Sequence, residues 1–268
     1  MEISNTSETI SDNGNEVSIF SHRGGIITSI KIKAVEILYQ DMYKETLLDY
    51  TKSVKWWIPY MFPNAWPLNA NEKESSWLDL PQHWIWRINQ WTKLNSSQKW
   101  EYVQEFRFEK SKDYPFNWTV KNTTKLLDDW VEIMHEIENK SVKNMPISTW
   151  LHPYFRIPEW KKEEIQFNFI WWKEVEKLVN IWSNDGTITF ENPWKPFEVN
   201  IPWLWTLTIE VSSQYKKFWV RSLPWKDFIC IEPVMWNEWA IANNPVIVEP
   251  WSTNVNYMKI FLDAETSK

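Results

Sequence analysis

Hydrophobic and polar residues alternate along much of this chain. An alternation with a period of two is typical of a strand that has one face buried. Turn residues separate these runs at short intervals, as in proteins built from many short strands. The expected strands cover Val17 to Ser21, Ile26 to Ile32, Val35 to Tyr39, Glu101 to Phe108, Thr119 to Lys125, Val131 to Glu138, Ile165 to Phe169, Thr187 to Phe190, Thr206 to Val211, Phe218 to Ser222 and Phe228 to Ile231.

Helical periodicity is weak throughout the sequence. Residues 172–180 form the best short helix candidate, and residues 63–82 form a long polar loop. Neither a linker nor a repeat of fixed period divides the chain. We therefore expect residues 1–268 to form a single all-β domain, a large antiparallel β-sandwich.

Charge and composition narrow the functional class. The net charge of −6 and the pI of about 5.4 argue against a nucleic-acid surface. The single cysteine, Cys230, excludes an intramolecular disulfide. The N-terminus lacks the pattern of a signal peptide, and no apolar run approaches the ~20 residues that span a bilayer. We expect a cytoplasmic protein with neither a nucleic-acid nor a membrane partner.

The tryptophan content is unusual, with 23 Trp and only 4 Gly. Average usage predicts roughly 19 Gly for this length. Many of the Trp follow proline in turns, where glycine belongs because it takes φ > 0 without steric cost. Our hypothesis is that most Trp occupy glycine-like backbone positions; the alternative is a Trp-rich carbohydrate-binding surface. The turn examples are Trp160, Trp194, Trp225 and Trp251, whereas Trp91 and Trp219 fit ordinary strand aromatics.

Two stretches carry candidate acid–base chemistry. One is Leu-His-Pro-Tyr-Phe, which holds His152, and the other is Phe-Ile-Cys-Ile-Glu-Pro, which ends an apolar strand at Glu232. Histidine titrates near neutral pH, and burial raises the pKa of a carboxyl group toward the same range. On opposite sides of a small molecule, His152 and Glu232 would form an acid–base pair that needs no metal. The structural alternatives are a histidine hydrogen-bonded beside a proline turn and a solvated strand end.

Several segments together resemble the aldose 1-epimerases, also called galactose mutarotases, and their hexose-6-phosphate epimerase relatives. In order they read RGGIITSIKIKAVEILYQD, IPYMFPNAWPLN, LPQHWIWRINQW, LHPYFRIP, FICIEP and VEPWST, and they span nearly the whole chain. The resemblance implies a galactose mutarotase-like supersandwich. It also implies interconversion of the α and β anomers of an aldohexose, with Glu232 as the base and His152 as the acid.

The resemblance also implies sugar-binding residues. His83 matches a second site histidine and Arg87 matches an arginine that contacts hydroxyls or phosphate; the alternatives are a loop histidine and a surface charge. Asp185 is placed either on sugar hydroxyls or in a type I turn, and Arg156 at the pocket rim. The segment Asn64-Ala65-Trp66-Pro67 lacks the arginine that true aldose epimerases carry there. This departure leaves the identity of the sugar open.

These residues define a leading function and its rivals. The four histidines have no metal-ligand spacing, so we expect neither a metal nor a cofactor. The leading hypothesis is a mutarotase with a small-molecule sugar as partner, acting as a monomer or homodimer. The rivals are a glucose-6-phosphate 1-epimerase and a non-catalytic carbohydrate-binding protein on the same fold. The family has glycine or another small residue at several Trp positions, among them Trp84, Trp86, Trp150 and Trp251, which agrees with the turn hypothesis.

Overall fold

The computed structural model describes most of the chain as β-strands. The described residues are 7–40, 45–49, 57–64, 67–68, 80–81, 85–168, 187–201, 204–236 and 240–263. Helices in these residues are short, and the longest has six residues. They are α1 (Glu45–Leu48), the 3₁₀ helices η1 (Ile85–Ile88) and η2 (Glu159–Glu164), and α3 (Ala240–Asn243).

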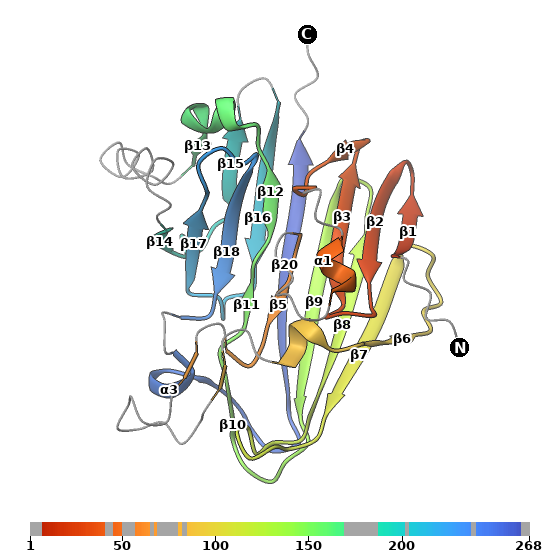
Figure 1. The fold of residues 1–268 in the computed structure, drawn as a ribbon, viewed down its shortest axis with the longest axis vertical. Coiled ribbons are helices and arrows are strands. Elements are labelled where there is room, and N and C mark those ends of the chain that lie inside the picture. The colour runs from red at the N-terminus through yellow and green to blue at the C-terminus, as the bar shows by residue number, and fades with distance from the viewer. Residues whose placement is uncertain are drawn as a thin grey trace.

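The largest sheet has eight antiparallel strands in the order β13-β15-β16-β20-β9-β8-β7-β6 (Figure 1). Its centre is formed by the longest strands, which alternate buried and less buried residues along their length. The bounds are β6 (Thr92–Leu94), β7 (Glu101–Phe108), β8 (Trp118–Leu126), β9 (Trp130–Asn139), β13 (Gln166–Phe167), β15 (Phe197–Ile201), β16 (Trp205–Val211) and β20 (Thr253–Asp263).

Three smaller sheets complete the fold. A six-stranded sheet has the order β14-β17-β18-β11-β5, with β12 also paired to β18. Its strands are β5 (Tyr60–Met61), β11 (Trp150–Leu151), β12 (Tyr154–Arg156), β14 (Thr187–Glu191), β17 (Lys217–Arg221) and β18 (Phe228–Val234). The N-terminal sheet contains β1 (Glu8–Asp12), β2 (Asn15–Phe20), β3 (Ile26–Ile32) and β4 (Val35–Glu36), and a two-stranded sheet pairs β10 (Met145–Ile147) with β19 (Val246–Val248).

One hydrophobic cluster lies between the large sheet and the smaller ones. It takes Ile19 from the N-terminal sheet, Ile133 and Ile260 from the eight-stranded sheet, and Val220 and Ile229 from the six-stranded sheet. Figure 1 shows β1 and β2 beside β8, which they contact, and β17 and β18 in front of β15 and β16. The expected antiparallel β-sandwich is therefore confirmed.

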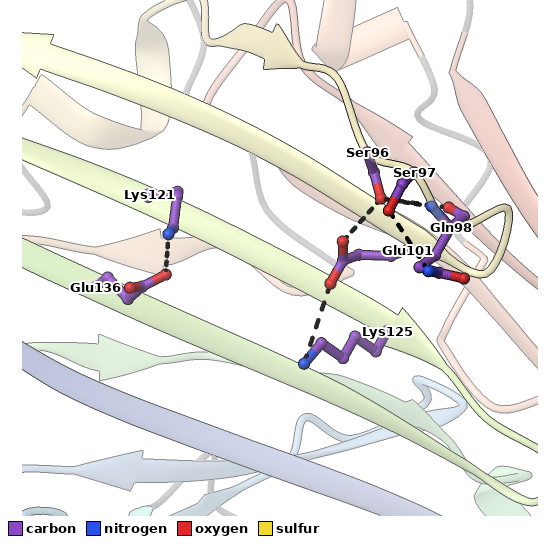
Figure 2. A network of polar contacts seen from close by, with 7 residues as sticks. All are labelled: Ser96, Ser97, Gln98, Glu101, Lys121, Lys125 and Glu136. Atoms are coloured by element: carbon purple, nitrogen blue, oxygen red, sulfur yellow. Dashed lines mark hydrogen bonds and ion pairs between the residues drawn. The ribbon is translucent and has the colours of Figure 1, made fainter.

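The opposite face of the eight-stranded sheet carries charged residues. Lys121 on β8 and Glu136 on β9 lie 2.6 Å apart, and Lys125 reaches Glu101 at 4.0 Å (Figure 2). The hydroxyl of Ser96 donates to Glu101 at 2.7 Å. Such half-exposed pairs contribute at most about 1 kcal/mol each, so they keep this face polar while the buried cluster stabilises the sandwich.

The N-terminal sheet is joined to the six-stranded sheet through the segment that follows β4. The Tyr39 N–H donates to the carbonyl of Tyr154 at 2.8 Å, and the Arg156 N–H donates to that of Ile37 at 2.9 Å. On the far side of this junction, the Ile58 N–H donates to the Ile27 carbonyl at 3.1 Å. The first two bonds fix β12, which carries candidate site residues.

The expected strands agree well with those observed, with some omissions. The bounds of β3 and β7 are as expected, and the others differ by a few residues at the ends. The expectation missed β20, the longest strand, although Asn256, Met258, Ile260 and Leu262 alternate as its buried positions. It also missed β1, whose hairpin turns at Asn13-Gly14 with φ of 49° and 80°. The five-residue strand β15 and the short strands β5, β6, β10, β11, β12 and β19 were missed as well. The helix candidate at 172–180 lies outside the described residues.

Three turn tryptophans have the backbone conformation that was expected. The φ angle is 57° at Trp194, 62° at Trp225 and 59° at Trp251, and each residue directly follows a proline. Their side chains are 65%, 89% and 66% exposed. A left-handed backbone costs an L-residue roughly 1–2 kcal/mol, and these indoles bury little surface to offset that cost.

The turn at Trp251 shows why glycine suits this position. The Ser252 N–H donates to the carbonyl of Glu249 at 3.2 Å, which closes a four-residue turn around Pro250 and Trp251. A turn with proline second and a positive φ at the third residue is a type II turn, and its third position favours glycine.

The hypothesis that most Trp occupy glycine-like backbone positions is wrong for the described residues, because ten of the fourteen described Trp have no positive φ. Trp160 does not have a positive φ, because it lies two residues after Pro158 and continues the 3₁₀ helix η2. Trp150 does not have one either, because it pairs with Met61 in the extended strand β11. Trp57 has a φ of 65° and is buried at 1% exposure. Trp91 and Trp219 are buried aromatics without positive φ, as expected.

Within the described residues, the helices are too short and too polar for any of them to cross a membrane.

Candidate functional site

The candidate site lies on the face of β18 that points away from the main hydrophobic cluster. Ile229 and Ile231 belong to that cluster, so the alternate residues Cys230 and Glu232 face the other way. All seven residues of β18 are buried, Glu232 included at 3% exposure. Cys230 and Glu232 are therefore two buried, chemically reactive residues on one face of an otherwise apolar strand.

Strand register brings His152 to Glu232. On one side of β18, Trp150 pairs with Val234 and Tyr154 pairs with Cys230. The same register puts His152, between β11 and β12, opposite Glu232. The His152 Nε2 atom lies 3.3 Å from Glu232 Oε1.

This contact corrects one expectation about geometry. We expected the two groups on opposite sides of a sugar-sized gap, but they lie on one face and in contact. The physical reason is their position as cross-strand neighbours, whose Cβ atoms lie about 4.5–5.5 Å apart. A substrate would therefore approach the pair from one side.

The imidazole of His152 is held on both sides. Its backbone N–H donates to the carbonyl of Pro59 at 3.2 Å, next to β5. Its ring stacks on Tyr154, with 4.5 Å between ring centroids and 3° between planes. The Tyr154 hydroxyl also lies 3.4 Å from Nε2. Tyr154 thus fixes the ring plane, and the Nε2 edge points at Glu232.

Burial changes the acidity of Glu232. Desolvation raises the pKa of this carboxyl group from 4.5 to about 8, and the positive charge of Arg221 opposes the shift. A charge placed in a low-dielectric environment is disfavoured, so the protonated form persists to higher pH. Glu232 therefore titrates near neutral pH, as general acid–base chemistry requires.

Two neighbours of the pair were not predicted as site residues. Cys230 is fully buried and shares a face with Glu232. Arg221 pairs with Cys230 across β17 and β18, on the side away from Tyr154. Its charge acts on Cys230, Tyr154 and Glu232 and favours the ionised form of each. Alternation with Glu232 could have indicated Cys230, but Arg221 depends on the register between two strands.

Two indoles lie on the same face. Trp219 pairs with Glu232 on the β17 side, opposite to His152. Its ring meets Trp150 edge-on, with 4.5 Å between centroids, and the two pack with Met61 and Val234 in a separate buried cluster. Trp219 and Trp150 therefore form an apolar wall beside the carboxyl group.

Arg87 lies within electrostatic range of the site. It is 9% exposed, and its charge lowers the pKa of the Tyr154 hydroxyl against the larger effect of burial. Its position depends on Gly24, where a Cβ would lie 2.6 Å from the Arg87 carbonyl oxygen. The Gly24 N–H also donates to Asn89 at 2.6 Å, so the close approach of this turn fixes η1.

Of the other predicted residues, only Arg156 is described, and it does not lie at the pair. Arg156 lies on β12 beyond Tyr154, and it lines a cavity of about 520 Å³ together with Glu36, Gln40 and Trp57. His83 and Asp185 lie outside the described residues, so their sugar-binding roles stay predictions.

The comparisons agree on the fold. The Slr1438 protein of Synechocystis sp. PCC 6803 superposes with a TM-score of 0.84 at 19% identity, covering 97% of this chain and 96% of that one. A galactose mutarotase related enzyme from Lactobacillus acidophilus has a TM-score of 0.75 at 16% identity, covering 98% and 99%. A galactose mutarotase-like protein from Clostridium acetobutylicum has a TM-score of 0.73 at 17% identity, covering 96% and 94%. The chain has the galactose mutarotase-like fold.

The assignment of the galactose mutarotase-like fold is based on structural similarity and not on sequence similarity. No protein-family model matches the sequence, and no curated protein sequence matches it. At identities of 19% and below, the similar structures establish the fold alone. The function has to be argued from the geometry around Glu232.

Proposed function

We propose that this protein is a cofactor-independent aldose 1-epimerase. The observation that carries the proposal is the contact between His152 Nε2 and Glu232 Oε1, 3.3 Å apart on a buried face. The names of similar structures, a galactose mutarotase related enzyme among them, support the same activity.

The proposed reaction needs two proton transfers at one carbon. The anomeric carbon of a cyclic aldose bears both a hydroxyl group and the ring oxygen. Glu232 takes the proton of the anomeric hydroxyl while protonated His152 gives a proton to the ring oxygen. The bond between the anomeric carbon and the ring oxygen breaks, and an open-chain aldehyde forms. Because the two oxygens share one carbon, an acid and a base in contact suit this step.

Ring closure reverses the two transfers on the other face of the carbonyl. Rotation about the C1–C2 bond presents that face to the hydroxyl that was the ring oxygen. His152 takes back the proton of this hydroxyl as it attacks, and Glu232 returns its proton to the new anomeric oxygen. The pair ends with the protons it began with, so no redox partner or cofactor is required.

Tyr154 supports this chemistry without transferring a proton in it. Its ring stacks parallel to the imidazole, and its hydroxyl lies 3.4 Å from Nε2. An imidazole held in one plane loses little freedom when the substrate binds, which favours a productive geometry. We therefore assign Tyr154 a positioning role.

Polarimetry tests the proposal directly. Freshly dissolved α-glucose and α-galactose should reach their equilibrium rotation faster with the protein than without it. Binding of these sugars without acceleration would overturn the proposal and favour a carbohydrate-binding protein that uses the Trp150 and Trp219 wall. If the sugars do not bind and their mutarotation is not accelerated, the result would argue against both functions.

The second candidate function is a hexose-6-phosphate 1-epimerase. The observation that favours it is the presence of Arg87 and Arg221, which both act electrostatically on Tyr154. Guanidinium groups bind phosphate through paired hydrogen bonds. Polarimetry with α-glucose 6-phosphate separates the two candidates, because a phosphate-dependent enzyme should lose most of its kcat/KM with free glucose.

A further inference from the structure

Three metal-binding side chains meet at the candidate site. The donor atoms of His152, Cys230 and Glu232 all lie within 4.8 Å of one another. They follow from the register, because Cys230 and Glu232 share one face of β18 and His152 lies opposite Glu232. The ligands come from β18 and from the connection between β11 and β12, so the sequence spacing that argued against a metal could not reveal them.

We propose that a thiophilic divalent cation, of which Zn²⁺ is the model, binds to these three residues. Sulfur, imidazole nitrogen and carboxylate oxygen are the ligand types of Zn²⁺, at about 2.0–2.3 Å from the metal. Around a tetrahedral ion, such ligands lie about 3.3–3.6 Å apart. The separation of 3.3 Å between His152 and Glu232 already matches. Cys230 needs to approach by at most about 1.3 Å, within the range of a side-chain rotation.

The charges in the proposed complex balance. On binding, the Cys230 thiol releases its proton to solvent, and the carboxyl group and imidazole release any proton they hold. One thiolate and one carboxylate then neutralise the two positive charges of the ion. Three protein ligands leave a fourth tetrahedral position for water or a sugar hydroxyl, as in catalytic zinc sites.

Occupation of this site would stop the proposed epimerase reaction. The ion would occupy the Nε2 lone pair and the carboxylate oxygen that have to exchange protons with the substrate. This consequence rests on the proposed function, whereas the binding itself does not. The protein would then be a sugar epimerase that thiophilic metals inhibit.

The single cysteine makes the binding test specific. Co²⁺ is added to the protein after chelator treatment, and the absorption spectrum is recorded. A thiolate bound to Co²⁺ gives a charge-transfer band in the near ultraviolet, and Cys230 is the only thiol that can supply it. We expect the band together with strong visible bands typical of tetrahedral Co²⁺, and we expect added Zn²⁺ to remove both. A folded protein without the charge-transfer band at saturating Co²⁺ would overturn the proposal.

Variants separate a three-ligand site from a lone thiol. Cys230→Ala should abolish the charge-transfer band, and circular dichroism should confirm that it is folded. If Cys230→Ala does not fold, His152→Gln and Glu232→Gln serve instead, and each should weaken Co²⁺ binding at least tenfold. His135→Gln, at a buried histidine on another sheet, should leave binding unchanged. Equal Co²⁺ affinity in His152→Gln, Glu232→Gln and the parent would contradict the proposal.

A kinetic measurement connects the site to function. If the protein is an epimerase, Zn²⁺ should inhibit it and a chelator should restore its rate. An inactive protein with the Co²⁺ band would keep the metal site and reject the epimerase. An active protein without the band would keep the epimerase and reject the metal site. Failure of the proposed function can therefore be told apart from failure of the proposed metal site.

Discussion

At the scale of single residues, the central feature is a carboxyl group that the fold keeps in an apolar strand. Glu232 has Ile231 and Pro233 as chain neighbours and lies between His152 and Trp219 across the sheet. Burial of a carboxyl group costs free energy that a structural role would not require. The pKa of about 8 that results is close to the pH at which a cellular base operates.

The first prediction concerns the rate as a function of pH. Glu232 has to be ionised to act as the base, and its pKa is raised from 4.5 to about 8. We therefore expect the rising limb of the kcat/KM profile to have an apparent pKa of about 8. Because the mechanism also needs protonated His152 as the acid, the rate should fall again at higher pH. Polarimetry as a function of pH checks the profile. An acid limb with its midpoint near pH 4.5 would show that another group is the base.

The second prediction concerns the loss of that base. Glu232→Gln keeps the shape of the side chain, and we expect kcat/KM to fall by about 10²- to 10⁴-fold. Glu198→Gln, at an exposed position on β15, is the matched control and should keep the parental rate. Equal losses in both variants would point to a general defect in the protein and not to chemistry.

The third prediction concerns His135, which the sequence analysis left without a function. It is buried on β9 and faces Asn122 and the edge of the Tyr60 ring. Desolvation lowers its pKa from 6.5 to about 3, so the folded protein holds it neutral. The unfolded chain binds this proton below pH 6.5, and stability should fall as pH decreases from there toward 3.

A matched variant isolates the contribution of His135. His135→Gln keeps an N–H donor for Asn122 and does not titrate. We expect the unfolding free energy of the parent to drop more steeply with decreasing pH, by up to about 1.4 kcal/mol per pH unit. Glu232 has the opposite sign, because its raised pKa weakens stability from pH 4.5 up to about 8. The difference between parent and variant in urea titrations removes that background, and identical slopes would contradict the prediction.

At the scale of elements, the turns have a glycine-like geometry but carry indoles. Pro193-Trp194 joins β14 to β15, Pro224-Trp225 joins β17 to β18, and Pro250-Trp251 precedes β20. In each turn the proline fixes the first φ, and the tryptophan takes the positive φ. The polar partners are intact: the Trp194 N–H donates to Asn192 at 3.0 Å, for example. The backbone conformation of each turn suits glycine, but the side chain present is that of tryptophan.

The fourth prediction follows from these turns. Replacing Trp194, Trp225 and Trp251 by Gly removes a strain of about 1–2 kcal/mol at each position. The greater freedom of glycine in the unfolded chain offsets about 0.5–1 kcal/mol of this gain. We expect the triple variant to melt higher, by about 2–4 °C for each kcal/mol gained. Calorimetry measures the change.

Trp160 is the control for this series. It is 71% exposed, like the three turn residues, but its backbone is that of the 3₁₀ helix η2. Its ring also lies 4.8 Å from the Lys161 ammonium group. Trp160→Gly relieves no positive φ and should therefore leave Tm unchanged or lower it. A lower Tm in the triple variant as well would show that the turn indoles are stabilising groups.

At the scale of the whole molecule, the sequence predicts the fold better than the site. The alternation of apolar and polar residues predicted both ends of β7 correctly, because the two faces of this strand differ in polarity. The family-like motifs, taken in their order along the chain, indicated the sandwich. His152 and Glu232 were found as a pair, although the contact between them depends on the register of β18 against β11 and β12. Arg221 and Trp219 reach the site only through the pairing of β17 with β18. The register between strands that are distant in sequence cannot be predicted from a local pattern, which is why these neighbours were missed.

The composition of the molecule leads to the last prediction. The chain has 23 Trp and 4 Gly, and four described Trp have φ between 57° and 65°. At about 1–2 kcal/mol each, these four would cost about 4–8 kcal/mol, a large share of the roughly 5–15 kcal/mol that stabilises a domain. We infer that glycine stands at these turn positions in the protein as its own cells make it, because glycine takes φ > 0 without steric cost.

Mass spectrometry of the protein from its own cells tests this explanation. We expect peptides across Trp194, Trp225 and Trp251 to contain glycine, and the intact mass to be lower by one Trp-to-Gly difference for each such site. The peptide with Trp91, a buried ring without positive φ, should still contain tryptophan. Tryptophan at all three turns would show that the chain does tolerate the strain, and the packing around those indoles would then have to supply the missing stability.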